Sequence, residues 1–274
     1  MTQPRATQPV TALIMAGQRS GEADIVAAHT GVALKAFTPI HERTMLSHVI
    51  DNLVACPAID TIMIAMPADI DPETHAPDIA ARIRDHNITR IDVGETPAAT
   101  VQKALNTQNV PAGRLLITTA DHPLLSADML TTFINEWQSD VALGVVSLDD
   151  LRAKFPEQRR TRLRFSDGMY KGCNLFGLDT RGDGINEMLT FWRKLEGLRK
   201  KPLAMARTIG TGTAVLYALR LLSLQGALDH IGKQVGMQVQ PVRLGEAEAA
   251  IDVDTVNDLE FVRAELADTS RDAA

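Results

Sequence analysis

Three aspartates stand where carboxylates could bind a metal ion. Asp121 follows the apolar run 114–119 and precedes Pro123, so we expect it at the carboxyl end of a buried strand. A carboxylate at that position could supply the oxygen ligands that Mg²⁺ requires. Asp252 and Asp254 are two residues apart in a strand-like stretch, so they should point to the same side, and either could reach the same cation. The alternative is that all three are turn or helix-entry aspartates.

A second set of residues could bind an anion. The apolar run 12–16 predicts a strand that ends at Gly17, and the polar loop that follows carries Arg19 and Ser20 before Lys35. Backbone amides around the glycine and the two cations could hold phosphate groups. The stretch matches neither the G-x-x-x-x-G-K-[ST] nor the G-x-G-x-x-G pattern. A strand-to-helix connection with solvated charges is the alternative.

Cations and an amide in the second half could bind another phosphate. The run Lys-Gly-Cys-Asn at 171–174 ends in Asn174, and the segment 193–201 is rich in lysine and arginine, including Arg199, Lys200 and Lys201. Such groups could bind the phosphate of a second substrate. A cation-rich helix end that is simply solvated is the alternative. His122 is expected to be positional.

The elements that must position these residues alternate between strand and helix patterns in the first half. This alternation with short loops predicts a parallel sheet covered by helices on both faces. The ligand of such a sheet lies at the carboxyl ends of the strands, where the loops after Ala16 and Thr119 should both lie. The expected strands are 61–66, 88–93, 114–119 and 141–146, and the expected helices are 45–55, 79–86, 98–106 and 126–137.

The second half changes character. Two strands, 161–165 and 171–178, should form a hairpin through the turn at Asp167 and Gly168. Leucine, methionine and alanine at helical spacing predict a long helical region over 186–236. Strand-like stretches follow at 238–244 and 250–253. Thr255 should cap a final helix that continues through Leu266, with Asp258 as the N3 carboxylate, three residues after the cap.

Composition excludes several classes of protein. The 274 residues are 45% hydrophobic and 23% charged, which is typical of a globular protein. The formal net charge of −6 disfavours nucleic acid binding. The sequence has no apolar run long enough to span a membrane and no hydrophobic signal segment near its start. The two cysteines are far apart and show no metal-ligand spacing. We therefore expect a cytoplasmic protein.

The motifs together resemble those of molybdenum cofactor guanylyltransferase-like (MobA-like) NTP transferases. The similar segments are LIMAG at 13–17, KAFTPI at 35–40, DHPLL at 121–125, and VDT at 253–255 with Asp258-Leu259. Thr100-Val101 with Ala104-Leu105 is also similar to a helix start that touches the nucleotide in cytidylyltransferases of this class. The resemblance extends over residues 12–262.

The resemblance implies an α/β fold of the Rossmann-like GT-A type, with a central, mostly parallel sheet flanked by helices and a helix-rich insertion in the second half. It implies a single domain over 11–267. A nucleotide-binding half would cover 11–150, and an acceptor-binding half would cover 151–267, with the helical insertion at 185–236. Residues 1–10 would be a disordered lead and residues 268–274 a tail.

The resemblance further implies transfer of a nucleoside monophosphate from an NTP to a phosphorylated small-molecule or lipid-headgroup acceptor, with release of pyrophosphate. It implies Mg²⁺, or Mn²⁺, as cofactor, and it allows a homodimer. The catalytic residues would be Lys35, Arg19 and Asp121. The metal ligands would be Asp121 and Asp254, with Asp252 as the alternate. The acceptor would meet Asn174, Arg199, Lys200 and Lys201. The nucleotide would meet Ala16, Gly17, Gln18, Arg19, Ser20, Lys35, Thr100 and Thr119.

Three other classes compete with this interpretation. A non-catalytic nucleotide-binding regulator is the strongest rival, because Gln18 replaces a glycine of the family loop. A GT-A glycosyltransferase would hold its metal with a D-x-D segment, and Asp121-His122-Pro123 stands in its place. A Rossmann dehydrogenase is the weakest rival, because its glycine fingerprint is missing.

Overall fold

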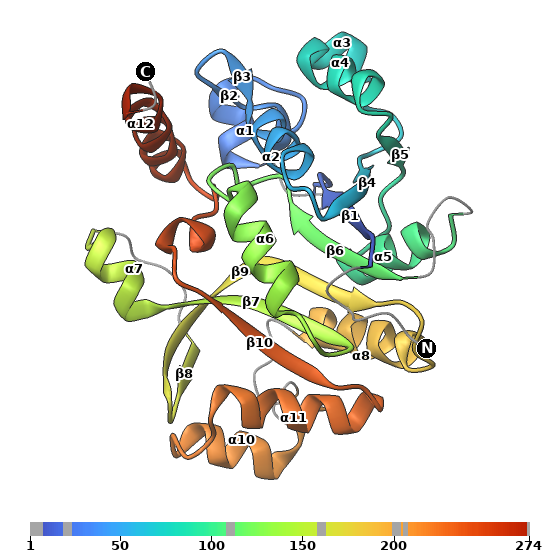
Figure 1. Cartoon of the computed structure of the whole chain (residues 1–274), viewed down its shortest axis with the longest axis vertical. Helices are drawn as coiled ribbons and strands as arrows, with labels where there is room; N and C mark the ends of the chain where they lie inside the picture. Colours follow the sequence, from blue (N-terminus) through green and yellow to red (C-terminus); the bar gives the residue numbers. More distant parts are fainter. Residues whose placement is uncertain are drawn as a thin grey trace.

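Strands from both halves of the sequence build one central sheet. The computed structural model describes residues 8–18, 24–107, 113–157, 163–198, 204 and 208–272. Within them, seven strands lie in the order β10-β7-β9-β6-β1-β4-β5, and β8 pairs with β9 (Figure 1). Their bounds are β1 (Val10–Met15), β4 (Ile59–Ala65), β5 (Thr89–Ile91), β6 (Arg114–Thr119), β7 (Val141–Ser147), β8 (Leu163–Phe165), β9 (Gly168–Asp179) and β10 (Val239–Leu244).

The sheet is mostly parallel, as the sequence predicts. β1 pairs in parallel with β4 and β6, β4 pairs with β5, and β7 pairs with β10. β9 is antiparallel to both β6 and β7, so a strand from the second half of the sequence lies between two strands of the first half. A two-stranded ribbon of β2 (Pro39–Ile40) and β3 (Arg43–Thr44) lies apart from the sheet.

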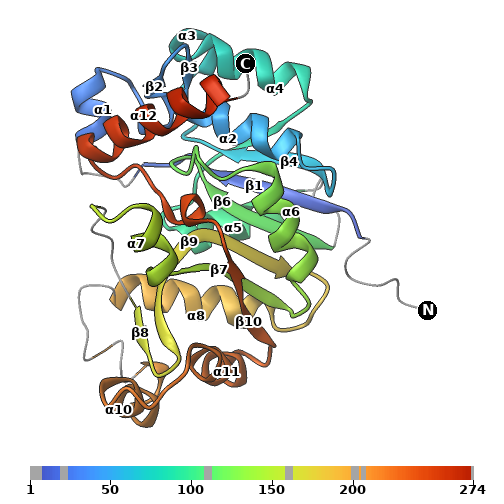
Figure 2. The same ribbon diagram turned by 60° about the vertical axis from the view of Figure 1, so that its left-hand side comes forward.

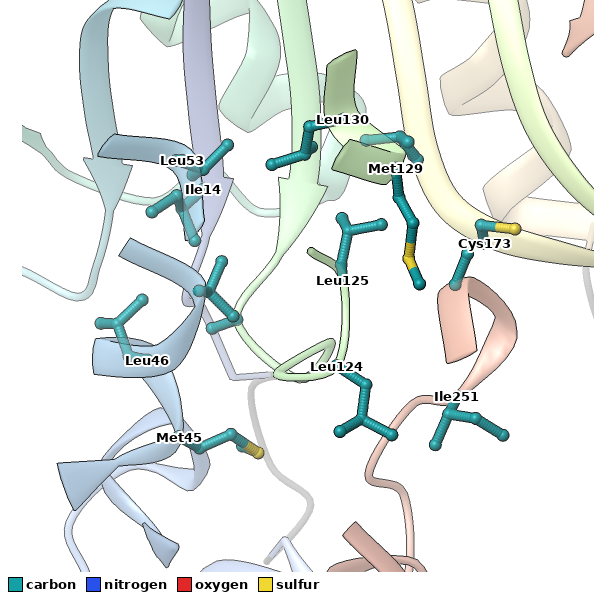
Figure 3. Packing of buried hydrophobic residues seen from close by; sticks show 14 of the residues in the cluster. Ile14, Met45, Leu46, Leu53, Leu124, Leu125, Met129, Leu130, Cys173 and Ile251 are labelled. Atoms are coloured by element: carbon teal, nitrogen blue, oxygen red, sulfur yellow. The ribbon is translucent and has the colours of Figure 1, made fainter. Parts of the chain in front are cut away.

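Helices cover both faces of the sheet, which is why β1 is a continuous apolar run. Leu13 and Ile14 are neighbours on β1, yet they pack into separate cores on opposite faces. The helices α2 (Met45–Val54) and α6 (Ala127–Glu136) contribute to the core of Ile14, part of which Figure 3 shows. The helices α5 (Pro97–Leu105), α8 (Ile185–Leu198) and α11 (Leu224–Val235) contribute to the core of Leu13. β1 and β6 therefore have two buried faces, and the polar residues of the site come from the loops at their carboxyl ends.

The helices agree with most of the expected segments. Their bounds are α1 (Ile25–Thr30), α2 (Met45–Val54), α3 (Pro72–His75), α4 (Pro77–Asp85), α5 (Pro97–Leu105), α6 (Ala127–Glu136), α7 (Leu148–Lys154), α8 (Ile185–Leu198), α10 (Thr211–Ala218), α11 (Leu224–Val235) and α12 (Val256–Asp272), with 3₁₀ turns η2 (Lys35–Phe37) and η3 (Ala247–Ala250). None of the described helices is long and apolar enough to cross a membrane.

Three predictions of secondary structure are wrong in part. Residues 250–253 form no strand, because the chain leaves η3 and binds the loop after β6 through Val253 N–H and the Asp121 carbonyl (3.0 Å). The helical region 186–236 is not continuous, since α10 ends before the left-handed residue Arg220 and α11 begins at Leu224. Helix α12 runs to Asp272 and so includes part of the expected tail.

The ends of two other predicted segments fall on residues outside the described part of the chain. Residues 1–7 of the expected disordered lead lie there, and β1 already begins at Val10, inside that lead. Residues 161 and 162 of the expected hairpin also lie there, whereas Leu163–Phe165 pairs with β9 as predicted.

Gly177 on β9 offers a test of packing in the centre of the sheet. A Cβ at Gly177 would lie 2.5–2.7 Å from three atoms of the Trp137 ring, which is buried beneath the guanidinium of Arg114 at 4.1 Å. We expect Gly177→Ala to lower the free energy of unfolding by about 1–3 kcal/mol, because a rigid ring must move. Urea unfolding measures this.

Gly172→Ala is the matched control, because Gly172 lies on the same strand and its Cβ would meet nothing within 4 Å. Equal stability of the two variants would contradict the packing argument.

Candidate active site

The site lies at the carboxyl edge of the sheet, between the ends of β1 and β6. Met15 pairs with Thr119 at the last position of both strands. The Ala120 amide donates to the Met15 carbonyl (3.1 Å), and the Ala16 amide donates to the Ala65 carbonyl (2.9 Å). The loops that follow Ala16 and Thr119 are therefore neighbours, as the strand pattern predicts.

Lys35 occupies the centre of this edge. Its ammonium donates to Asp121 Oδ2 (2.6 Å) and to the Val253 carbonyl (3.0 Å), and it lies 3.5 Å from Asp254 Oδ1. The turn η2 fixes Lys35, because its next two residues, Ala36 and Phe37, are buried in the core. Three segments far apart in the sequence thus converge on one ammonium.

The charges in this group stabilise one another. Burial opposes the charged form of Lys35, but the neighbouring Asp121 carboxylate outweighs it, so the pKa of Lys35 lies above its usual value. Burial likewise opposes the ionised form of Asp121, and the Lys35 ammonium outweighs it, so the pKa of Asp121 lies below its usual value. The Thr119 hydroxyl also donates to Asp121 Oδ1 (2.6 Å). Both groups are therefore charged near neutral pH.

The oxygen atoms around Lys35 suit a hard divalent cation. They belong to two carboxylates, Asp121 and Asp254, and to the Val253 carbonyl. The described residues contain no cluster of three or more histidines, cysteines or acidic residues that could hold a metal by themselves. Two carboxylates suffice for Mg²⁺, which usually completes its coordination with water and substrate phosphates. The donor set therefore fits the expected ion.

Asp254 is held at the entry of α12 by a capping box. The Asp258 carboxylate accepts from the amides of Asp254 (3.2 Å) and Thr255 (2.8 Å), and the Thr255 hydroxyl accepts from the Asp258 amide (3.2 Å). The predicted capping roles of Thr255 and Asp258 are confirmed. The side chain of Asp254 is 66% exposed, so it faces solvent at the edge of the site.

Asp252 lies in a different environment from Asp254. Its carboxylate is buried and lies 3.2 Å from Lys171 Nζ on β9. The expectation that the two aspartates share one side of a strand is wrong, because residues 250–253 follow the loop after β6 instead of a neighbouring strand. Of the two aspartates, Asp254 is therefore the better placed to bind a metal. The ion pair of Lys171 with Asp252 could not be predicted from the sequence, where Lys171 is one residue of the run 171–174.

Asn174 lies on an irregular part of β9. Leu143 of β7 pairs with Phe176 and Val145 with Gly172, so β9 inserts extra residues between these pairs, and Asn174 has a positive φ of 47°. This bulge directs the Asn174 amide nitrogen to His122 Nε2 at 3.0 Å. The region expected to bind the acceptor thus lies beside the Asp121 loop.

His122 connects Asn174 to that loop from a fully buried position. Burial lowers its pKa, so the imidazole is neutral near pH 7. With Nε2 accepting from Asn174, the proton lies on Nδ1, which has no hydrogen-bond partner among the described residues. His122 has no exposed surface, and its hydrogen bond to Asn174 links β9 to the Asp121 loop.

The glycine loop packs against the loop that precedes α5. A Cβ at Gly17 would lie 2.9 Å from Val93 Cγ1, so only glycine allows this approach without movement. The neighbouring Gly94 amide donates to the Thr100 hydroxyl (2.9 Å), and that hydroxyl donates to the Thr96 carbonyl (3.1 Å). Thr100 is buried and holds the loop, and a direct contact with a nucleotide stays a prediction for it.

The expected residues of the glycine loop and the second half are placed only in part. Ala16 is buried, and Gln18, which follows Gly17, is exposed. Arg19, Ser20, Arg199, Lys200 and Lys201 lie outside the residues that the structure describes. The structure therefore brings together Ala16, Gly17, Lys35, Thr119, Asp121 and Asp254 at one edge, with Asn174 next to it.

A mostly parallel sheet with glycine, lysine and aspartate loops at its carboxyl edge defines an α/β protein of the nucleotide-binding kind. Residues 12–231 match the family model described as the MobA-like NTP transferase domain. The chain therefore belongs to this family, and it is an enzyme of the nucleotidyltransferase class. The family and the fold expected from the sequence motifs are both confirmed.

Solved structures have the same fold. A hypothetical transferase from Thermus thermophilus is 25% identical, with a TM-score of 0.75 over 92% of this chain and 100% of that chain. The 4-diphosphocytidyl-2C-methyl-D-erythritol synthase of Anaerococcus prevotii has a TM-score of 0.55 at 14% identity, over 94% of this chain and 97% of its own. A search of curated protein sequences finds no match.

A third similar structure contains a nucleotide. It is CMP:2-keto-3-deoxy-manno-octonic acid synthetase in complex with CTP, with a TM-score of 0.55 at 14% identity over 96% of this chain and 100% of that one. At this identity the likeness concerns the fold alone.

Proposed function

We propose that the protein transfers a nucleoside monophosphate from an NTP to a phosphorylated acceptor. An oxygen of the acceptor phosphate attacks the α-phosphorus, a new P–O bond forms, and the bond between the α-phosphorus and the bridging oxygen breaks to release pyrophosphate. Because the acceptor phosphate already carries a nucleophilic oxygen, no general base is required. Catalysis then consists of positioning and of neutralising charge.

The observation that carries this proposal is the position of Lys35 between two carboxylates. One cation there lies within 3.5 Å of oxygens from both Asp121 and Asp254. In the proposed reaction these carboxylates hold Mg²⁺ or Mn²⁺, which would supply positive charge to the triphosphate. Lys35, Arg19 and the amides around Gly17 neutralise the charge on the transferred group and the leaving pyrophosphate.

The acceptor side of the site is assigned to Asn174 and to the cations Arg199, Lys200 and Lys201. Asn174 is directed to the Asp121 loop through His122, and Lys171 lies on the same strand. An amide and nearby cations suit a phosphate, whether a small molecule or a lipid head group carries it. Use of an NTP also agrees with the cytoplasmic location expected from the sequence.

A substrate screen tests the proposal. The full chain is incubated with each of the four NTPs and Mg²⁺ against sugar phosphates, alditol phosphates and lipid head-group phosphates, and pyrophosphate is measured. We expect release that depends on one NTP and one acceptor and that stops with a chelator. Tight NTP binding without pyrophosphate release for any acceptor would count against the proposal.

Asp254 provides a separate test of the metal site. We expect Asp254→Asn to raise the Mg²⁺ concentration for half-maximal activity by at least about tenfold, because loss of a direct ligand should cost no less than loss of a supporting residue. The measurement is a Mg²⁺ titration of pyrophosphate release. Asp69→Asn, at another exposed aspartate, is the control and should leave the titration unchanged. An unchanged titration for Asp254→Asn would remove this residue from the metal site.

A further inference from the structure

One surface of the protein exposes an unusual concentration of large apolar side chains. Of the eight large hydrophobic residues that are exposed in the described chain, six gather on α10, the turn after it, and β8. Leu219 and Leu221 are 62% and 65% exposed. We call this set the α10 surface, and its apolar members are Leu163, Val215, Leu216, Tyr217, Leu219 and Leu221.

Contacts hold β8, α10 and the turn after α10 against one another. The ring of Tyr217 packs edge-on against Phe165, with ring centroids 5.4 Å apart. The Tyr217 hydroxyl accepts from the Arg164 amide (3.3 Å), and Leu222 binds the end of β8 through its carbonyl and Ser166 N–H (2.8 Å). In both views α10 lies beside α11 and β8, at the end of the molecule away from α12 (Figures 1 and 2). The apolar residues are therefore a fixed feature of the fold.

The same surface is cationic in an otherwise acidic protein. Arg164 and Arg220 are both exposed, and neither lies within ion-pair distance of a carboxylate of the described residues. The nearby Asp167 is paired with Arg243 at 2.9 Å, so its charge is compensated. The whole chain has a formal net charge of −6, so two exposed arginines on one surface, outside the ion pairs of the described residues, are distinctive. Apolar and positive groups thus coincide.

We propose that the α10 surface docks the protein onto an anionic lipid bilayer. Large exposed apolar patches mark interaction sites, and a combination of leucines with arginines matches a membrane surface, which offers an apolar layer beneath negative head groups. A symmetric contact between two copies would use the same patch on both of them. Arg164 and Arg220 of one copy would then lie near the same two arginines of the other copy, and the like charges would repel one another. Charge complementarity therefore favours the bilayer over self-association.

The placement of the surface has a consequence for the site, which rests on the proposed function. β9 is antiparallel to β7, so its first residues, together with β8, extend beyond the carboxyl end of β7. Tyr170 pairs with both Ser147 and Leu163, and Lys171 follows directly. The α10 surface and the acceptor side of the site therefore share one edge of the sheet. Docking would bring that edge close to phosphorylated head groups.

Vesicle sedimentation tests the docking directly. The full chain is mixed with phosphatidylcholine vesicles with and without phosphatidylglycerol, at low and high salt. We expect binding to the anionic vesicles that weakens with salt, and an approximately tenfold loss of affinity in Leu219→Ser/Leu221→Ser and in Arg220→Glu. Ile25→Ser is the matched control, because Ile25 on α1 is 66% exposed and lies outside the α10 surface.

Other outcomes overturn the proposal. It fails if the wild-type chain does not bind anionic vesicles, or if the Leu219→Ser/Leu221→Ser variant binds as well as Ile25→Ser does. It also fails if sedimentation equilibrium shows a dimer that the leucine variant dissociates, since the surface would then be an interface between copies. Pyrophosphate release without vesicles should be unchanged in the leucine variant. A failure of the proposed transfer reaction is therefore distinguishable from a failure of docking.

Discussion

Replacing Lys35 with alanine is expected to lower the rate of pyrophosphate release by about 10²- to 10³-fold while the protein stays folded. Lys35 is the only cation of the described residues that contacts both Asp121 and Asp254, so the variant removes the one ammonium that the structure holds between them. Losing one preorganised charge contact of this kind typically costs this much in rate. Single-turnover measurements with saturating NTP would separate loss of chemistry from loss of binding.

Asp121→Asn should cause a loss of the same order, because the amide keeps the shape of the side chain but removes its charge. If Lys35 and Asp121 act as a unit, the double variant should lose little more than either single variant. Arg84→Ala is the control, because it breaks an exposed ion pair with Glu73 on α3, remote from the site in sequence. Near wild-type turnover in both Lys35→Ala and Asp121→Asn would mean that the catalytic site has been misplaced.

The location of this site could be predicted from the sequence because it depends on local patterns. The apolar runs ending at Ala16 and Thr119 are buried strands of a parallel sheet, and the residues that follow such strands must meet at one edge. In the structure Asp121 directly follows the buried Ala120 after β6, and Lys35 directly precedes the buried pair Ala36 and Phe37 of η2. A side chain that directly follows a buried strand lies close to the end of that strand, so its location can be predicted once the strand is recognised.

Residues of the second half could not be placed in the same way, because their positions depend on long-range pairing. The strand pattern of residues 168–179 gives no sign that β9 inserts antiparallel between β6 and β7. It also does not reveal the bulge that turns Asn174 toward His122. The two-residue period of a strand predicts that Asp252 and Asp254 face the same side, yet Asp252 is buried and Asp254 is exposed.

The exposure of α10 also could not be predicted from the local sequence. The run from Val215 to Leu222 has the composition of a buried helix, and in the sequence it is part of a long helical region. In the structure the chain turns at Arg220, where φ is +58°, and only Leu222 among these leucines is buried. An apolar pattern predicts that a helix forms, but whether another element covers it depends on the whole fold.

Asp252 and Lys171 provide the last test, because they separate a structural carboxylate from a metal ligand. Their side chains are only 8% and 12% exposed and lie 3.2 Å apart. Asp252→Asn removes the negative charge and leaves the Lys171 ammonium buried beside a neutral amide. We expect the free energy of unfolding to fall by roughly 3 kcal/mol, at the lower end of the range for breaking a buried pair, because an amide oxygen can still accept a hydrogen bond. Urea unfolding with a check for an unchanged m-value measures it.

The paired variants Asp252→Asn and Asp254→Asn should therefore show opposite effects. Asp252→Asn should lose stability and keep the Mg²⁺ dependence of pyrophosphate release, whereas Asp254→Asn should keep stability and lose metal affinity, because its side chain is largely solvated. Lys171→Met/Asp252→Leu should recover much of the lost stability, since a well-packed apolar pair can replace a buried ion pair without penalty. A shift in Mg²⁺ dependence for Asp252→Asn at unchanged stability would instead make Asp252 the ligand.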